Sequence, residues 1–206
     1  YTSGATAYAT LDTGMINHGN GTRRMFTNWN GDASGTNYAQ SDLISMDGPK
    51  TAIAVWKTQY LVSFTQTGAA MAPTVSYTAE TDPTDTVPFG VWVRAGSQIT
   101  YEYQNIVAGP SGTRYILIGT NPSSPQTVNA PLTITGTYKT QHQLTVRTSG
   151  LPVSTNVYNN TNVLGTAHDA LPYSGWFDAG SPLQLNIDSP ITIDLTQYVF
   201  DEWSGD

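Results

Sequence analysis

Hydrophobic and polar residues alternate over short runs along most of this 206-residue chain. The runs are rich in β-branched and aromatic residues and are bounded by Gly, Pro and Asn, which is typical of β-strands separated by turns. No window of helical length places apolar residues at i, i+3, i+4 and i+7. The pattern predicts an all-β fold of short antiparallel strands, with the clearest runs at residues 51–64, 97–107, 113–119, 130–146 and 181–187.

Residues 1–13, here called the leader, form a separate strand-like segment before these runs. Its apolar residues alternate with Thr, Tyr and Asp, so an extended strand would have one mildly apolar face. The Gly- and Asn-rich residues 14–21 follow it as a natural linker. Small side chains on the apolar face suit insertion between two sheets, and these candidate donor residues are Ala5, Ala7, Ala9 and Leu11.

Several phrases occur twice in the same order, which indicates an internal repeat. The recurring tryptophans occupy equivalent positions, as core anchors would, whereas a sugar-binding platform need not recur in this way. The repeated phrases are KTQ (57–59 and 139–141), VWVRAGSQI with GWFDAGSPL (91–99 and 175–183), GTRRMF with GTRYIL (21–26 and 112–117), and FTNWNGD with FDEWSGD (26–32 and 200–206). The predicted repeat core is Phe26, Trp29, Trp56, Trp92, Trp176, Phe200 and Trp203.

The repeat predicts two β-sandwich-like domains preceded by an extended N-terminal strand. We expect a donor strand and linker at 1–20, a first domain at 21–138 and a second domain at 139–206. The first repeat ends in a closing strand after a proline, at 131–138, and an equivalent strand occurs at 49–56. The second domain is expected to lack this closing strand.

A β-domain that lacks one strand has an unpaired edge, and such an edge is a template for pairing with another chain. Three solutions remain open from the sequence. The leader of a neighbouring copy inserts as the missing strand, residues 46–56 of the same chain fold back to supply it, or the leader is a disordered terminus. Insertion from a neighbour is a head-to-tail contact that does not close, and it therefore builds a fibre.

Composition narrows the class of protein further. The chain has 8 Lys and Arg against 15 Asp and Glu, a net charge of -7, so it offers no basic surface for nucleic acid. Charged residues are only 11% of the chain, so few ion pairs can form. The stability of the fold should therefore depend little on the ionisation of carboxylates, which fits an acidic habitat. A start at Tyr1, two N-x-S/T sequons at Asn20 and Asn159, and the absence of a transmembrane-length apolar run predict a processed, exported glycoprotein.

Candidate catalytic and metal-binding patterns are weak. His168 and Asp169 lack the motifs that accompany a hydrolase triad. The alternating Asn28, Asn30 and Asp32 resemble a calcium loop, but alanines stand at its Gly and Glu positions. We therefore expect no enzyme activity, no cofactor and no metal.

Lys57 and Lys139 recur on the same strand of the repeat. A buried lysine beside Asn or Asp forms an isopeptide cross-link in some surface β-domains, and the alternative is an ordinary strand lysine with its ammonium in water.

The phrases at 56–60, 175–181 and 200–206 resemble the divergent internalin-type B-repeat modules of archaeal cell-surface proteins. Such modules are mostly spacers and adhesion domains. The size, composition and N-terminal strand also resemble the subunits of archaeal thread-type surface filaments, which polymerise by donor-strand complementation. These resemblances imply an extracellular filament subunit that binds copies of itself, with a role in adhesion or cell contact and with glycans or other cells as further partners. The alternative is an adhesin or carbohydrate-binding fragment of a larger surface or S-layer protein.

Overall fold

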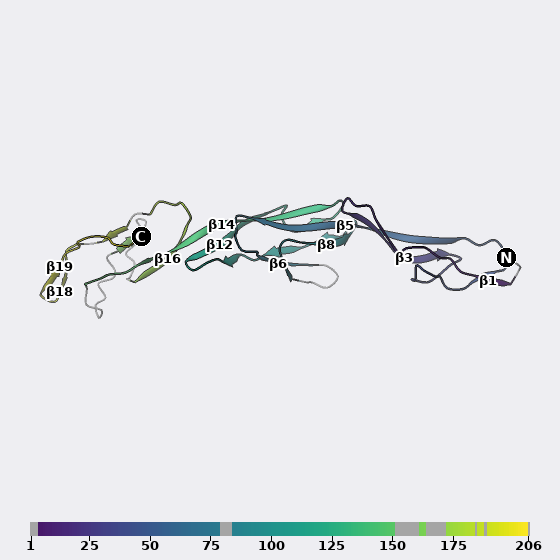
Figure 1. The fold of residues 1–206 in the computed structure, drawn as a ribbon, viewed down its shortest axis with the longest axis horizontal. Coiled ribbons are helices and arrows are strands. Elements are labelled where there is room, and N and C mark those ends of the chain that lie inside the picture. The colour runs from purple at the N-terminus through teal and green to yellow at the C-terminus, as the bar shows by residue number, and fades with distance from the viewer. Residues whose placement is uncertain are drawn as a thin grey trace. The chain divides into compact units, whose positions relative to one another are not determined.

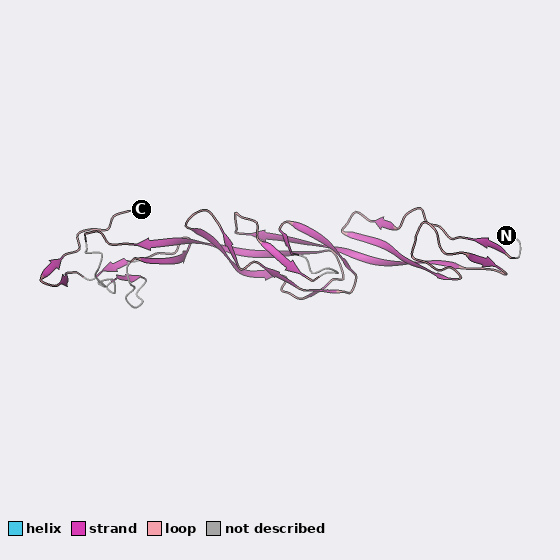
Figure 2. Ribbon diagram, turned by 90° about the horizontal axis from the view of Figure 1, so that it is seen from below, coloured by secondary structure: helices cyan, strands magenta, loops and turns pink. Residues whose placement is uncertain are grey.

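The computed structural model describes residues 4–78, 84–150, 161–163, 172–183, 185–187 and 189–205, and every regular element within them is a β-strand (Figures 1 and 2). The all-β prediction is therefore confirmed. Strand β6 (Thr74–Tyr77) alternates exposed and buried side chains because successive residues of a strand point to opposite faces. Within the same ranges there is no helix long and apolar enough to cross a membrane.

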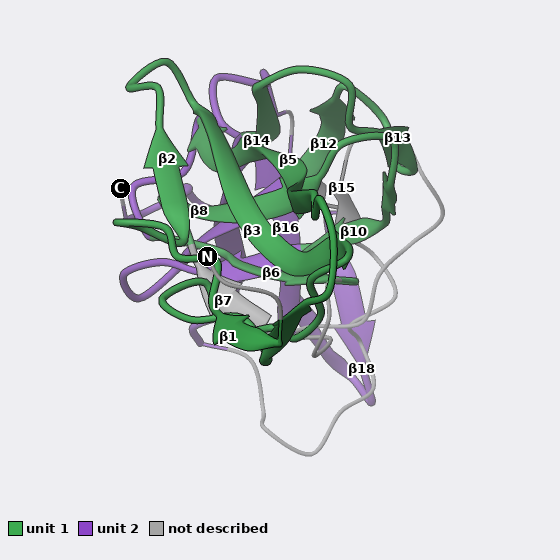
Figure 3. Cartoon of the chain, turned by 90° about the vertical axis from the view of Figure 1, so that its right-hand side faces the viewer, with its two compact units in different colours: residues 1–67, 72–105, 117–138 green, residues 68–71, 106–116, 139–206 purple. Residues whose placement is uncertain are grey.

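Two compact units divide the chain, coloured green and purple in Figure 3. Unit 1 comprises residues 1–67, 72–105 and 117–138, and unit 2 comprises residues 68–71, 106–116 and 139–206. One division thus falls between residues 138 and 139, where the repeat places a domain boundary. The short segments 68–71 and 106–116 group with unit 2 although the repeat places them in the first domain, and the leader groups with unit 1.

The strands that lie wholly in unit 1 are β1 (Ala5–Ala7), β2 (Met15–Asn17), β3 (Thr22–Gly31), β4 (Ile44–Met46), β5 (Ala52–Thr67), β6 (Thr74–Tyr77), β7 (Thr84–Thr86), β8 (Phe89–Arg94), β9 (Gln98–Ile99), β10 (Tyr101–Tyr103) and β13 (Gln126–Thr127). Those in unit 2 are β11 (Ile106–Ala108), β15 (Thr161–Val163), β16 (Tyr173–Asp178), β17 (Leu185–Ile187), β18 (Ile191–Ile193) and β19 (Thr196–Tyr198). Strands β12 (Thr113–Asn121) and β14 (Leu132–Val146) contribute residues to both units.

The core of unit 1 lies against the middle of the long strand β5. Strand β3 pairs antiparallel with its first half, and β8 pairs antiparallel with Gln59–Phe64. Phe64 is fully buried and stacks on Phe89, with ring centroids 4.7 Å apart, and on Tyr77 at 5.5 Å. Such aromatic contacts add to the hydrophobic free energy of burying each ring.

Strands β5 and β14 differ from the expected short antiparallel strands. They are 16 and 15 residues long, and Leu132–Thr137 of β14 pairs in parallel with Val62–Thr67 of β5. Both strands carry the KTQ phrase. Because they are the same element of successive repeats, they run in the same direction, and the chain between them crosses over as a parallel pair requires.

Unit 2 repeats the local pairing of unit 1. Gln141 pairs with Asp178 across β14 and β16, as Gln59 pairs with Arg94 across β5 and β8. The Ala179 amide donates to the Thr140 carbonyl at 2.9 Å, and the equivalent Ala95 amide donates to Thr58, also at 2.9 Å. The glycines of the two Ala-Gly-Ser turns, Gly96 and Gly180, have φ of 80° and 78°, which favours glycine at both positions.

Residues 46–56 do not close unit 2 in this structure. Ala52–Trp56 pair instead with Gly31–Phe26 of β3, within unit 1. The pairing that the sequence left as an alternative for this segment is therefore already used by its own repeat.

Candidate interaction site

Each repeat contains the same arrangement of arginine, glutamine and tryptophan. In unit 1 the Arg23 Nε donates to Gln59 Oε1 at 2.8 Å, and its guanidinium lies 4.4 Å from the Trp92 ring centroid. In unit 2 Arg114 donates to Gln141 at 2.9 Å and lies 4.5 Å from Trp176. The arginine thus joins side chains from neighbouring strands by a hydrogen bond and a cation–π contact. This arrangement explains why two of the predicted tryptophans recur, and its role is structural.

The edge of β5 beyond this arrangement is covered in unit 1. Leu132–Thr137 of β14 pairs along Val62–Thr67, and β14 lies between β5 and β12 in the strand order. The hydroxyl of Tyr103 lies 2.8 Å from the Thr65 carbonyl oxygen and 2.9 Å from that of Ile134, so it links the two paired strands. Burial raises the pKa of Tyr103 to about 12, because the phenolate would lose its hydration. Gly136 leaves room for that ring, since a Cβ there would meet Tyr103 Cδ1 at 2.5 Å.

The equivalent edge in unit 2 lies on β14 and the residues that follow it. The KTQ alignment matches Val62–Thr67 of β5 with residues 144–149. One edge of Leu144–Val146 pairs with Gly175–Tyr173 of β16. On the other edge the last backbone hydrogen bond is donated by the Gln143 amide to the Gly112 carbonyl. Beyond it, within the described ranges, no strand pairs with this second edge of residues 144–149.

A hollow of about 810 Å³, here called the groove, lies along this edge within unit 2. One wall comes from the end of β14 and the turn after it, and the other from β18, β19 and the residues that follow β19. The lining residues are Thr145, Arg147, Thr148, Ser149 and Gly150 on the first wall and Ile191, Tyr198, Val199, Phe200, Asp201, Glu202, Trp203 and Ser204 on the second. A strand edge that has no partner among the described residues therefore meets exposed aromatic side chains in one place.

Phe200 and Trp203 in the groove are the repeat equivalents of Phe26 and Trp29. The ring centroids are 5.3 Å apart and tilted by 57° for Phe26–Trp29, and 5.2 Å apart and tilted by 54° for Phe200–Trp203. Their burial differs sharply: Trp29 is 6% exposed, whereas Trp203 is 45% and Phe200 37% exposed. The structure thus departs from the core role expected for the last two residues, because no described segment of unit 2 forms a layer over them.

The leader covers the Phe26–Trp29 pair within unit 1. Trp29, Ala33 and Ile44 form a small buried cluster, and Ala9 and Leu11 pack against it. Strand β1 pairs antiparallel with β4, the Ser41 amide donates to the Ala9 carbonyl, and the Leu11 amide donates to the Tyr38 carbonyl. The leader from Gly4 to Leu11 is therefore hydrogen-bonded to its own chain, and the reading of it as a disordered terminus does not describe this structure.

Exposure alternates along the leader. The four candidate donor residues Ala5, Ala7, Ala9 and Leu11 are half-buried, and the intervening Thr6, Tyr8 and Thr10 are exposed. Sequence reasoning missed the partner segment, residues 43–46. This segment is short and alternates in exposure. Ile44 is buried and Met46 half-buried, while Leu43 and Ser45 are exposed.

The remaining candidates have ordinary surroundings. Asn20 is exposed in the turn between β2 and β3, where the His18 amide donates to the Thr22 carbonyl, while Asn159, His168 and Asp169 lie outside the described residues. Trp56 makes an edge contact with Phe26 at 5.9 Å. Asp32 accepts a hydrogen bond from the Thr51 amide and lies 3.6 Å from the Lys50 ammonium.

The two repeated lysines differ in their partners. Lys139 forms a salt bridge of 2.8 Å with Asp178, and the pKa of Asp178 is lowered mainly by this hydrogen bond and further by one from Gln141. Both side chains of the salt bridge are roughly two-fifths exposed, which is unlike the buried lysine of an isopeptide site. In unit 1 the position of Asp178 is taken by Arg94, which cannot pair with Lys57.

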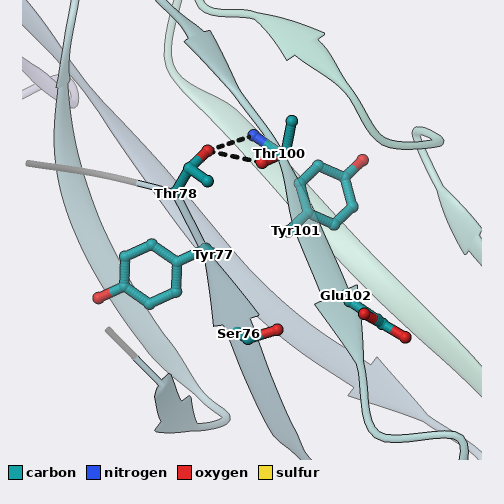
Figure 4. A pocket seen from close by; sticks show the side chains of 6 residues that line it. All are labelled: Ser76, Tyr77, Thr78, Thr100, Tyr101 and Glu102. Carbon is teal, nitrogen blue, oxygen red and sulfur yellow. Dashed lines mark hydrogen bonds between the residues drawn. The ribbon is translucent and has the colours of Figure 1, made fainter. Parts of the chain in front are cut away.

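A second, smaller hollow of about 290 Å³ lies in unit 1 between β6 and β10. Figure 4 shows the hydroxyls of Thr78 and Thr100 pointing toward each other, 2.6 Å apart, above the two tyrosines. Among the described residues that line it, Glu102 is the one carboxylate. The two hydroxyls are already bonded to each other, and the described lining residues offer no pair of groups arranged for acid–base or nucleophilic chemistry.

Comparison with models of known protein families, with curated proteins and with solved structures finds no match for this chain.

Proposed function

We propose that this protein is a structural subunit of an extracellular filament, which polymerises head-to-tail by inserting its N-terminal strand into the next subunit. The observation that supports this most directly is the pair of equivalent aromatic sites. One site, Phe26–Trp29, is covered by the leader, and the other, Phe200–Trp203, has the same ring geometry and is open. A segment that fits the first site has the chemistry to fit the second in another copy.

The leader is suited to exchange between copies. Its regular pairing consists of three residues, Ala5–Ala7 with Ile44–Met46, and a few hydrogen bonds beyond them. A terminal strand held by so few bonds opens locally at a small fraction of the global unfolding free energy. Exchange of an identical element between copies is a low-cost route to association, and a heterologous contact of this kind propagates into a fibre.

Mixing two defective variants tests the proposal. A variant without residues 1–13 keeps the groove, and a Trp203→Asp variant keeps the leader. We expect neither to form filaments in negative-stain microscopy, and we expect their mixture to form heterodimers and no longer species, because only one of the two possible contacts is productive. Filaments from the truncated protein, or a mixture that stays monomeric, contradict the proposal.

Two controls separate assembly from folding. Thr10→Asp places a charge on the exposed side of the leader and should leave filaments intact, whereas Ala9→Asp places it on the side packed against the aromatic cluster and should abolish them. Circular dichroism of each variant must show the wild-type β content for the comparison to count.

The groove also supports a second candidate, an adhesin or carbohydrate-binding module of a larger surface protein. Exposed Phe200 and Trp203 lie beside the carboxylates of Asp201 and Glu202, a combination that binds sugars through ring stacking and hydrogen bonds. Glycan-array binding that is lost in Trp203→Ala, together with a native protein that never polymerises, favours this function over the filament.

The proposed location is the cell surface. The exposed sequon at Asn20 and the low content of charged residues support an exported protein. Mass spectrometry of the native protein, with and without deglycosylation, measures whether Asn20 carries a glycan.

A further inference from the structure

Unit 1 shows how a strand closes this repeat. Leu132–Thr137 of β14 lies between two neighbours, with β5 on one side in parallel pairing and β12 on the other. The residues that point inward are Ile134 and Gly136, both buried, and the alternate residues are more exposed. The closing strand therefore needs two free edges and one apolar face with room for small side chains.

The repeat predicts an equivalent in unit 2 for each neighbour of the closing strand, β5 and β12. Residues 144–149 correspond to the β5 edge, because Gln141 and Gln59 occupy the same place in the arginine–glutamine–tryptophan arrangement. Residues from β19 onward correspond to β12, because Thr196-Gln197-Tyr198 aligns with Thr113-Arg114-Tyr115 and each follows a hairpin partner, β18 or β11. These two segments are the two walls of the groove.

We propose that the groove of unit 2 binds the leader of a second copy as a strand parallel to residues 144–149, with Ala7 opposite Leu144 and Ala9 opposite Val146. This inference rests on the proposed filament function and adds the acceptor edge, the strand direction and the register. Parallel direction follows from unit 1, where the closing strand runs parallel to the equivalent edge.

The leader fits better than residues 46–56, the other segment that the sequence offered for this place. One edge of Ala52–Val55 is occupied by β3, so that segment has a single free edge, and the groove needs two. Release of the leader breaks less pairing, because β1 pairs with β4 over three residues whereas β3 pairs with β5 over nine. Once released, the leader has both edges free. Inward-facing residues on the acceptor edge are Leu144, Val146 and Thr148, which the alternating Ala7, Ala9 and Leu11 match in parity.

Charge narrows the register to those that bring Asp12 close to Arg147. Asp12 is the only charged side chain of the leader, and Arg147 is the only one among residues 144–149. Neither forms a salt bridge with any residue that the structure describes. In the proposed register Asp12 lies opposite Ser149, diagonal to Arg147 and within reach of it. An antiparallel leader that overlaps the whole edge would instead place Asp12 at the Leu144 end, away from Arg147.

Cysteine cross-linking tests the direction, because the chain has no native cysteine. Full-length variants with one cysteine in the leader (Ala7→Cys, Ala9→Cys or Leu11→Cys) are mixed pairwise with mass-tagged variants that have one on the acceptor edge (Leu144→Cys, Val146→Cys or Thr148→Cys). Under mild oxidation we expect the pairs 7/144, 9/146 and 11/148 to cross-link several-fold more than the pairs 7/148 and 11/144. Tyr8→Cys with Val146→Cys is the control of opposite parity and should stay near background.

Four results would overturn the inference. Preferred cross-links at 7/148 and 11/144 mean an antiparallel strand, and preferred cross-links from Ala52→Cys or Ala54→Cys to the groove mean a different occupant. Filaments that form while no leader cysteine links to residues 144–148 mean that the filament function stands and this acceptor edge is wrong. Absence of both filaments and cross-links rejects the function together with the inference.

A charge exchange tests the register separately. Arg147→Glu should weaken heterodimer formation several-fold at low salt, and adding Asp12→Arg in the partner copy should restore it. Arg147→Gln with wild-type leader is the matched control and should lie between the two. If Asp12→Arg fails to rescue Arg147→Glu while the 9/146 pair still cross-links, the Asp12–Arg147 register is wrong. Only the assignment of Ala7, Ala9 and Leu11 to the inward face then stands.

Discussion

The two aromatic pairs of the repeat have nearly the same internal geometry and opposite surroundings. Phe26–Trp29 is enclosed by Ala33, Ile44 and the leader, and Phe200–Trp203 faces the groove. Their rings meet at almost the same distance and tilt, so the pair forms from the strand phrase itself and does not depend on what covers it. The difference shows that the repeat specifies an apolar surface, while a separate segment supplies its cover.

The two strands that carry the KTQ phrase, β5 and β14, differ in the same way at the level of the backbone. The β5 edge at Val62–Thr67 has a parallel partner and a tyrosine hydroxyl bonded across the pair, whereas residues 144–149 have neither among the described residues. Tyr103 is buried at the β5 edge that has a partner. The groove lies at residues 144–149, the edge without a partner among the described residues.

The largest expected effect comes from the aromatic pairs. Trp29→Ala removes a ring that is 6% exposed and whose Nε1 donates to the Asn37 carbonyl, so we expect unit 1 to lose about 3–5 kcal/mol of unfolding free energy. Trp203→Ala removes a half-exposed ring and should cost less than about 1 kcal/mol in the monomer. Urea unfolding followed by circular dichroism measures both. Equal losses would mean that Trp203 is covered in solution by a segment of its own chain.

Tyr103→Phe should rank second, because it removes the hydroxyl that links β5 to β14 and leaves two carbonyls without that donor. The expected loss is about 1–3 kcal/mol, and the exposed Tyr38→Phe is the matched control.

The same hydroxyl gives a pH dependence of known sign. Burial raises the pKa of Tyr103 and of Tyr138 to about 12 from the ordinary 10.0, so the folded state keeps protons that the unfolded state releases. Their contribution is therefore complete below pH 10.0 and is lost as the pH rises toward 12. Wild-type thermal stability should fall in this alkaline window, and Tyr103→Phe should fall less steeply. An unchanged slope in the variant contradicts the burial of this phenol.

The fold class and the repeat follow from the sequence because they depend on local patterns. Alternation and turn residues predict strands, and the recurring KTQ and Ala-Gly-Ser phrases correspond to strands paired in the same register in both units. The parallel pairing of β5 with β14 was not predicted. Alternation gives the faces of a strand and says nothing of the direction of its neighbour, which is set by contacts far apart in the sequence such as Tyr103 with Ile134.

The candidate site could be predicted only in part. The sequence predicted an open edge in the second domain, and a groove lies at the equivalent residues. The sequence predicted Phe26 and Trp29 as core residues but not that the leader covers them, because the partner of the leader is the short β4, whose three residues carry too little pattern to be distinguished from a loop. Equal sequence phrases also predicted equal burial for Trp29 and Trp203, and burial depends on segments outside the phrase.

The arginine arrangement should give a smaller and equal effect in both units. Arg23→Lys and Arg114→Lys keep the charge and lose the planar stacking on Trp92 or Trp176 and the directed bond to the glutamine, for an expected loss of about 0.5–2 kcal/mol each. The exposed neighbour Arg24→Lys is the control and should be nearly neutral. Chemical denaturation of the three variants measures this. A large loss in one unit only would show that the repeated contacts differ in strength despite their matching distances.

The smallest effect concerns the one position where the repeats differ in charge. Asp178 pairs with Lys139 in unit 2, and Arg94 occupies its place in unit 1, so Asp178→Asn should lower stability slightly and Arg94→Asp should raise it slightly, by giving Lys57 a partner. Both changes should vanish in 1 M salt, where the screening length is about 3 Å.

The pKa of Asp178 is lowered below its ordinary 3.8, chiefly by the hydrogen bond from Lys139, so the unfolded state takes up the proton first as the pH falls. The contribution of the pair is thus present above pH 3.8 and lost below it, and the melting temperature should stay nearly constant from neutral pH down to that value. A melting temperature that already falls steeply above this value would show that carboxylates other than Asp178 hold the fold together.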